Sequence, residues 1–157
     1  MIASTLASAQ ATEAFGAQLA SVIAEGCIIY LQGELGTGKT TLVRGLLDAL
    51  GYEGAVRSPT YTLVEPYSLQ GKQILHLDFY RLVDPEELEF IGLRDWFDGQ
   101  TILLVEWPEH GDGVLPEADL QVELQHSGDG RLCRLRANSV KGEKVLAGLN
   151  LKPSRET

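Results

Sequence analysis

Residues 27–51 read CIIYLQGELGTGKTTLVRGLLDALG, and this stretch decides the fold class. The segment from Cys27 to Leu31 is short, rich in isoleucine and apolar on both faces, which predicts a strand buried inside a sheet. Leucine and valine then recur at helical spacing from Lys39 to Leu50, and Gly51 follows as the expected helix terminator. A glycine-rich turn therefore joins a buried strand directly to a helix.

The turn itself carries a phosphate-binding pattern. Residues 33–40, GELGTGKT, match G-x-x-x-x-G-K-S/T between a predicted strand and a predicted helix. The glycines allow consecutive N–H groups to point at one anion, and the following helix adds its positive end. Lys39 is expected to reach the β- and γ-phosphates and the hydroxyl of Thr40 to bind Mg²⁺. The predicted nucleotide-binding residues of the loop are Gly36, Thr37, Gly38, Lys39, Thr40 and Thr41.

A magnesium site of this type also needs a carboxylate at the end of a neighbouring apolar strand, and two residues qualify. The segment ILHLD ends in Asp78, and the segment ILLVE ends in Glu106. Both would lie at the carboxyl edge of the sheet, where ligands of open α/β sheets bind. One would ligate Mg²⁺, directly or through water, while the other orients the attacking water or contacts a partner. Residue types alone do not rank the two, and a solvated loop acid is the alternative for each.

Further elements are expected around this unit. The first helix is predicted from Thr12 to Glu25, with Thr12 as its cap. Residues 58–67 and 73–80 predict two strands of an antiparallel hairpin, and Asp84 with Pro85 predicts a helix start. Other expected elements are a strand over 101–106, a hairpin of residues 118–124 and 131–137, and a closing helix over 141–149. We expect one α/β domain over residues 1–157, with a mixed parallel and antiparallel sheet of the P-loop NTPase type flanked by helices.

Composition and charge exclude several classes of protein. The 157 residues are 44% hydrophobic, enough for one compact domain. A net charge of -9 gives no general attraction to a nucleic-acid backbone or an anionic membrane. No basic side chain precedes Lys39 and no apolar run approaches membrane-spanning length, so neither a leader nor a membrane span is expected. Cys27 and Cys133 lack the spacing of a zinc or redox motif, which favours a reducing cytoplasm.

The pattern also bears on the nucleotide and the reaction. Nothing matches the N-K-x-D signature expected of guanine-specific sites, so ATP is favoured over GTP. A small-molecule kinase usually carries a basic lid, and the cations near the loop other than Lys39 are few: Arg44, Arg57, Arg81 and Arg94. A small-molecule P-loop kinase and a non-hydrolysing nucleotide-sensing adaptor remain the alternatives to an ATPase.

Four segments, in this order, carry a resemblance to a known family. They are the loop, SPTYTLVEPY (58–67), HLDFYRLVDPEELEFIGLRDWF (76–97) and LLVEWPEHG (103–111). With all four, the chain resembles the TsaE family, the ATPase component of bacterial tRNA threonylcarbamoyladenosine biosynthesis. The resemblance implies a cytoplasmic, Mg²⁺-dependent ATPase that is weak alone and acts on a complex of TsaD-like and TsaB-like proteins. That complex modifies adenosine 37 of tRNA, and this chain would meet tRNA only through it, with no role for a membrane or DNA.

The resemblance also assigns roles to single residues. Lys39 and Thr40 fall on the family's loop lysine and Mg²⁺-binding threonine, and Glu106 falls on its second Mg²⁺ ligand. Asp78 and Trp107 fall on residues important for activity. The candidate catalytic residues are therefore Lys39, Asp78, Glu106 and Trp107, the candidate metal ligands are Thr40 and Glu106, and Thr12 is the expected contact to the base.

Four other features have two interpretations each. The hydroxyl-rich segment 58–67 could order around a γ-phosphate as a switch, or form an ordinary edge strand. Trp107 could anchor a partner at the mouth of the site, or pack in the core. His76 lies on the same side of its strand as Asp78, although a core histidine is the simpler interpretation. The acidic residues Glu86, Glu87 and Glu89 form either a solvated helix face or part of a docking surface.

Overall fold

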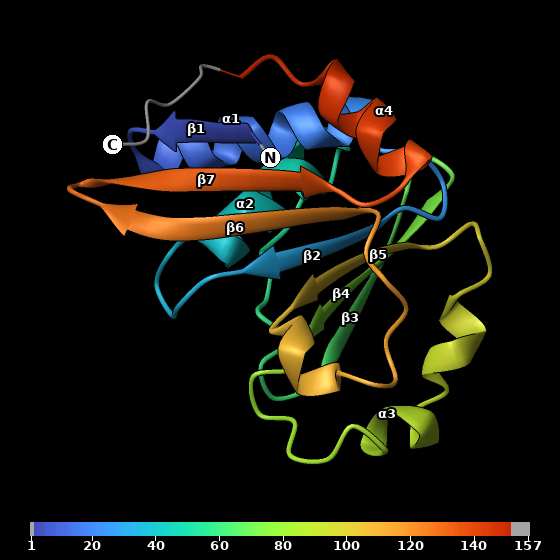
Figure 1. Cartoon of the computed structure of the whole chain (residues 1–157). Helices are drawn as coiled ribbons and strands as arrows, with labels where there is room; N and C mark the ends of the chain where they lie inside the picture. The colour runs from blue at the N-terminus through green and yellow to red at the C-terminus, as the bar shows by residue number, and fades with distance from the viewer. Residues whose placement is uncertain (1, 152–157) are drawn as a thin grey trace.

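The computed structural model describes residues 2–151, which build one seven-stranded sheet in the order β1-β7-β6-β2-β5-β4-β3 (Figure 1). The strands are β1 (Ile2–Leu6), β2 (Ile28–Gln32), β3 (Val64–Leu69), β4 (Lys72–Asp78), β5 (Ile102–Glu106), β6 (Leu120–Ser127) and β7 (Gly130–Ala137). The helices are α1 (Ala9–Val22), α2 (Lys39–Ala49), α3 (Glu87–Phe90) and α4 (Val140–Gly148), with short 3-10 helices η1 (Leu93–Trp96) and η2 (Pro108–Gly111).

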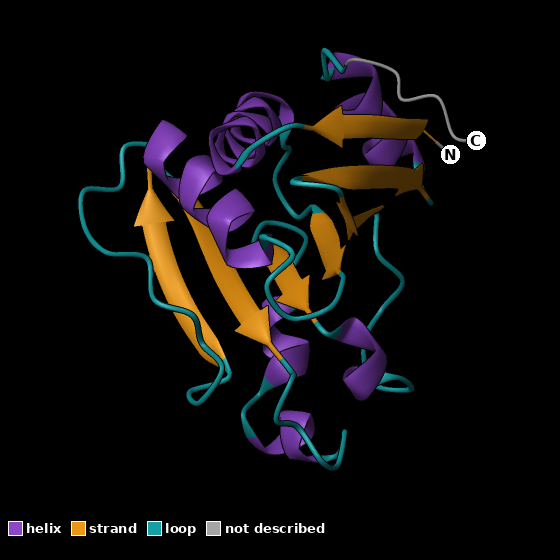
Figure 2. Ribbon diagram, turned by 90° about the vertical axis from the view of Figure 1, so that its left-hand side faces the viewer, coloured by secondary structure: helices purple, strands orange, loops and turns teal. Residues whose placement is uncertain are grey.

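The sheet is mixed, as the sequence predicts. The pairs β6–β2, β2–β5 and β5–β4 at its centre are parallel, whereas the pairs β3–β4, β6–β7 and β1–β7 are antiparallel. Figure 2 shows the twist of the sheet, with steep strands at one edge and nearly horizontal strands at the other. The carboxyl ends of β2, β4 and β5 therefore meet at one edge, where the glycine-rich loop leaves β2.

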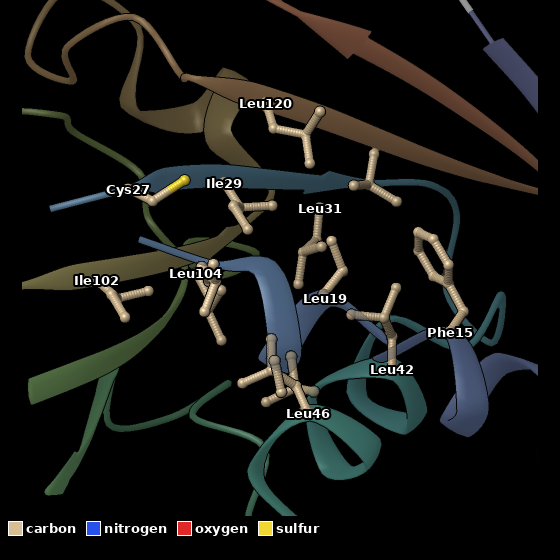
Figure 3. Packing of buried hydrophobic residues seen from close by; sticks show 14 of the residues in the cluster. Phe15, Leu19, Cys27, Ile29, Leu31, Leu42, Leu46, Ile102, Leu104 and Leu120 are labelled. Carbon is tan, nitrogen blue, oxygen red and sulfur yellow. The ribbon is translucent and has the colours of Figure 1, made fainter. Parts of the chain in front are cut away.

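Alternating residues of the central strands fill two cores, one on each face of the sheet. On one face, Ile29 and Leu104 pack with Leu42 and Leu46 of α2 and with residues of α1 (Figure 3). On the other face, Leu103 belongs to a second cluster with residues of α3, η1 and the segment after β4. Burial on both faces explains why β2 and β5 read as continuous apolar runs.

Two glycines bring the backbones of α1 and α2 into direct contact. A Cβ atom at Gly16 would lie 2.1 Å from the carbonyl oxygen of Leu42, and one at Gly45 would lie 2.1 Å from the carbonyl oxygen of Glu13. Only glycine fits at either position without moving a helix. The contact fixes α2 against α1, and α2 begins at the glycine-rich loop.

The first helix begins earlier than predicted. Ser8 is its N-cap, and the Ser8 side chain accepts a hydrogen bond from the N–H of Ala11 at 3.1 Å. The prediction that Thr12 caps the helix is therefore wrong, because Thr12 is buried one turn inside it. The small residues of the first turn gave no apolar periodicity, so the pattern placed the start too late. The helix also ends at Val22 rather than Glu25.

The predicted strand over residues 58–67 is only partly correct. Strand β3 begins at Val64, and residues 59–63 form a turn that the N–H of Leu63 closes onto the carbonyl of Pro59 at 2.8 Å. Leu63 has a φ of 68°, which ends extended pairing at that point. The turn lies beside the end of β4, since the N–H of Asp78 donates to the carbonyl of Leu63 at 3.0 Å.

The helix predicted at Asp84 is one turn long. Asp84 accepts from the N–H of Glu86 at 3.0 Å, as a capping residue does, but α3 ends at Phe90. Gly92, with a φ of 78°, turns the chain into η1. Strand β1, which pairs antiparallel with β7 at the edge of the sheet, was not predicted from the sequence. No helix within residues 2–151 combines the length and apolar character that crossing a membrane requires.

Candidate nucleotide-binding site

The glycine-rich loop connects β2 to α2 and depends on three left-handed glycines. Gly33, Gly36 and Gly38 have φ values of 145°, 79° and 105°. A Cβ at Gly33 would also meet the carbonyl oxygen of Leu124 at 2.5 Å, so this glycine is needed for close packing as well. Gly38 is the N-cap of α2 and has no side chain to cap it. The first N–H groups of α2 are therefore available to an anion.

Two of the cavities beside the loop are lined by the predicted site residues. The first, of about 230 Å³, is lined by the loop and start of α2 on one side and by β4, β5, Ser58 and Thr60 on the other. Its polar lining residues are Lys39, Thr40, Thr41, Ser58, Thr60, Asp78 and Glu106. The second, of about 250 Å³, lies beside α1 and the β6–β7 turn and is lined by Ser8, Thr12, Thr37, Thr41, Asp129 and Arg131, among others. The structure therefore brings together the predicted loop residues, both candidate carboxylates and Thr12.

The carboxylates of Asp78 and Glu106 enter the first cavity from neighbouring strands. Asp78 ends β4, Glu106 ends β5, and the two are register partners on this parallel pair. Both are buried, at 4% and 3% exposed. The prediction that both carboxylates lie at the carboxyl edge of the sheet is therefore correct.

Asp78 and Glu106 have different hydrogen-bond partners. One oxygen of Asp78 accepts from the hydroxyl of Thr60 at 3.0 Å, and the other accepts from the N–H of Tyr80 at 2.9 Å. Oε2 of Glu106 lies 2.6 Å from Nε2 of His76. Asp78 thus ties the hydroxyl-rich turn to β4, whereas Glu106 keeps Oε1 for another partner.

The side chain of Lys39 is packed into the loop. Its Nζ donates to the carbonyl oxygen of Gly33 and lies 4.2 Å from the ring centroid of Trp107. Burial lowers the pKa of Lys39, and the negative charges of Glu106 and Asp78 oppose that lowering. The ammonium group therefore sits on the wall of the first cavity, beside carboxylates that favour its charged form.

Trp107 stands at the mouth of the first cavity. It follows β5 with a φ of 55°, a conformation that bulky residues rarely adopt. Its ring packs between Tyr80 and His110, with centroid distances of 5.1 Å and 5.5 Å. Trp107 both lines the first cavity and packs, half-buried, against the second core cluster, so features of both interpretations are present. Its role in anchoring a partner remains a prediction.

Ser58 and Thr60, at the start of the 59–63 turn, hold that turn against the site through their hydroxyl groups. The hydroxyl oxygens of Ser58 and Thr60 lie 2.8 Å apart, and Thr60 in turn donates to Asp78. This part of the hydroxyl-rich segment is a turn facing the cavity, and only the part from Val64 onward is an edge strand. Whether it switches on binding remains a prediction.

Sequence reasoning missed the contribution of Arg131. From β7, its guanidinium donates to the carbonyls of Thr37 at 3.0 Å and Gly36 at 3.1 Å. Because these carbonyls are turned outward to Arg131, the peptide N–H groups that follow them are turned toward the opposite side of the loop. Arg131 lies 94 residues from Thr37, so no local pattern could have linked the two.

The oxygen ligands at this site suit Mg²⁺ bound partly by phosphate and water better than a metal ion bound only by protein side chains. Within residues 2–151, no group of three or more His, Cys, Asp or Glu side chains is arranged to hold a metal ion. Mg²⁺ is usually bound by one or two carboxylates together with phosphate oxygens and water. A hydroxyl at Thr40 and a carboxylate at Glu106, both lining one cavity, meet that need.

Comparison with known proteins decides the family. Residues 6–134 match the family model for the threonylcarbamoyl adenosine biosynthesis protein TsaE. The chain belongs to the TsaE family. A TsaE protein of Haemophilus influenzae is 46% identical over 141 residues, covering 87% of this chain and 89% of that protein. A TsaE protein of Bacillus subtilis is 36% identical over 118 residues, covering 75% and 73% of the two chains. Both carry the name tRNA threonylcarbamoyladenosine biosynthesis protein.

A solved structure also matches this TsaE-family fold. The crystal structure of Bacillus subtilis YdiB superposes with a TM-score of 0.79 at 27% sequence identity and covers 94% of each chain. The prediction of a mixed α/β sheet flanked by helices is therefore confirmed both by the strand pairing and by this neighbour.

Proposed function

We propose that this chain is a Mg²⁺-dependent ATPase of tRNA N6-threonylcarbamoyladenosine formation, activated by a complex of TsaD-like and TsaB-like proteins in the cytoplasm. Membership of the TsaE family supports the part in tRNA modification. The observation that carries the enzymatic part is the first cavity. There Lys39, the hydroxyl of Thr40 and two buried carboxylates meet beside an uncapped helix N-terminus.

The loop supplies what a triphosphate needs. Left-handed glycines and the start of α2 present N–H groups to the β- and γ-phosphates, and Lys39 adds a positive charge. Binding would exchange the contact of Lys39 with the Gly33 carbonyl for a contact with phosphate oxygen. The second cavity, with Thr12 on its wall, lies on the other side of the loop and suits the base and sugar.

The two carboxylates have different roles in this proposal. Thr40 and Glu106 would hold Mg²⁺, which neutralises phosphate charge when it is bound. Asp78 accepts from Thr60, so it couples the hydroxyl-rich turn to the end of β4 and can orient a water molecule beside the phosphate. We assign Mg²⁺ to Glu106 because its Oε1 is free, whereas both carboxylate oxygens of Asp78 already accept hydrogen bonds from Thr60 and Tyr80.

A slow reaction without partners also follows from the charges. In the described part of the chain, Lys39 is the only cationic side chain that lines the first cavity. Charge that develops on the transferred phosphoryl group commonly requires a further cation, and in related systems a partner protein supplies it. We therefore expect the TsaD-like and TsaB-like complex to complete the site.

The test compares ATP hydrolysis by the chain alone, by the chain with a TsaD–TsaB complex, and by Lys39→Ala in the same mixture. The proposal expects slow hydrolysis alone, a marked rise with the complex, loss of that rise in Lys39→Ala, and ATP-dependent threonylcarbamoylation of tRNA. Phosphorylation of a small metabolite at useful rates without partners would favour a kinase. Binding of ATP and partners with no hydrolysis under either condition would favour an adaptor.

A further inference from the structure

Buried behind the first cavity is a close contact between His76 and Glu106. Nε2 of His76 lies 2.6 Å from Oε2 of Glu106. The side chains are 0% and 4% exposed, so water does not compete for the contact. In the tautomer that carries its hydrogen on Nε2, His76 donates to the carboxylate of Glu106, which accepts. The contact thus orients the carboxylate.

The contact leaves the other oxygen of Glu106 available. His76 lies on β4, and its register partner on β5 is Leu104, so the imidazole approaches Glu106 diagonally across the parallel pair. Oε2 is engaged with His76, and Glu106 also lines the cavity beside Thr40. Oε1 is therefore the atom that remains to face a cation beside that threonine.

The second ring nitrogen of His76, Nδ1, is buried without a hydrogen-bond partner. Among the buried side-chain nitrogen and oxygen atoms of residues 2–151, Nδ1 of His76 is the one with no hydrogen-bond partner. A buried polar atom without a partner costs free energy, which an apolar side chain at this position would avoid. The bond from Nε2 to Glu106 is thus the polar contact that distinguishes histidine from leucine here.

Resting on the Mg²⁺ site of the proposed function, we propose that His76 is a positioning residue for the Mg²⁺ ligand Glu106. It holds the carboxylate with Oε1 toward the cavity and does not itself touch nucleotide or metal. Hydrogen bonds to ligating carboxylates orient the ligand, and their loss commonly lowers metal affinity or activity 10- to 100-fold.

The experiment measures nucleotide affinity by calorimetry, with Mg²⁺ and with EDTA, for the wild type and three variants. His76→Leu removes the donor, and His76→Gln keeps an amide N–H at a similar reach. His76→Asn keeps an amide that is too short to reach Glu106. The expected result is a loss of the Mg²⁺-dependent gain in affinity by about 10-fold or more in His76→Leu and His76→Asn, and rescue in His76→Gln. Affinity in EDTA should be unchanged for all variants.

A control and two outcomes make the test decisive. Ile74→Val, two residues earlier on the same face of β4, alters packing without touching Glu106 and should leave the Mg²⁺ dependence unchanged. Equal Mg²⁺ dependence in His76→Gln, His76→Asn and the wild type would overturn the positioning role, even if His76→Leu does not fold. If the wild type itself shows no Mg²⁺-dependent gain, the proposed metal site fails first, a result distinguishable from failure of His76 alone.

Discussion

The ammonium group of Lys39 lies over the indole ring of Trp107, 4.2 Å from the ring centroid. A cation over an aromatic face is attracted by about 0.5–2 kcal/mol, which a phosphate group can outcompete. The same lysine donates to the carbonyl of Gly33. The structure thus holds Lys39 between a backbone carbonyl and a tryptophan that lines the first cavity.

The first prediction uses Trp107 as a reporter. The chain has two tryptophans, so Trp96→Phe leaves Trp107 as the only tryptophan, which excitation at about 295 nm selects over the tyrosines. Adding Mg²⁺ and ATP should change its fluorescence, because Lys39 leaves the ring for the phosphates. Trp96→Phe combined with Lys39→Ala should lose the response. An unchanged emission spectrum at a nucleotide concentration that calorimetry shows to be saturating would contradict the prediction.

A second prediction concerns Arg131, which holds two loop carbonyls. Arg131→Ala should weaken ATP binding about 10-fold, because the loop loses its preformed orientation, and that change corresponds to about 1.4 kcal/mol. Arg136→Ala is the matched control, since it removes the same charge from an exposed position on the same strand. Equal affinities for the two variants would show that Arg131 does not organise the loop.

The glycine-rich loop and the central strands could be predicted from sequence because their determinants are local. Residues 33–40 carry the pattern, and the apolar runs before Asp78 and Glu106 mark buried strands. The edge strand β1 was not recognised, because it is half exposed and its pairing with β7 is set by residues more than a hundred positions away. The boundaries of α1 and α3 depended on Ser8 and Gly92, whose local hydrogen bonds and φ values outweighed apolar periodicity.

In the candidate site, too, locally determined features could be predicted and contacts between distant elements could not. Loop residues and strand-end carboxylates were predictable, since parallel strands bring their carboxyl ends to one edge. The contacts of Arg131 with the loop and of His76 with Glu106 join separate elements, so they required the three-dimensional packing. Period-two counting placed His76 on the correct side of its strand but could not supply its partner.

A third prediction tests the helix contact that places the loop. Gly45→Ala should lower the free energy of unfolding by about 3 kcal/mol, because the new Cβ would lie 2.1 Å from the carbonyl oxygen of Glu13. Asp48→Ala, at an exposed position of the same helix, should change it by less than about 0.5 kcal/mol. Urea unfolding curves measure both. Near-equal midpoints would show that α1 and α2 do not depend on this close approach.

A fourth prediction concerns alkaline pH. Burial raises the pKa of the Cys27 and Cys133 thiols from 9.0 to about 12. Above pH 9.0 the unfolded chain therefore loses protons that the folded chain keeps, so their contribution to stability is present below pH 9.0 and is lost toward pH 12. The double variant Cys27→Ala, Cys133→Ala should show a shallower fall in unfolding free energy over that range. Tyr30, whose pKa burial also raises to about 12, retains part of the slope.

The central claim is that the loop before α2 holds the phosphates of ATP, with Lys39 supplying the positive charge. Calorimetric titration of ATP with Mg²⁺ into wild type, Lys39→Ala and the exposed-lysine control Lys144→Ala tests it most directly. The account predicts one binding event in the wild type and the control, and affinity at least about 10-fold weaker in folded Lys39→Ala. Equal ATP affinity in all three proteins, or no binding by the wild type, would contradict it.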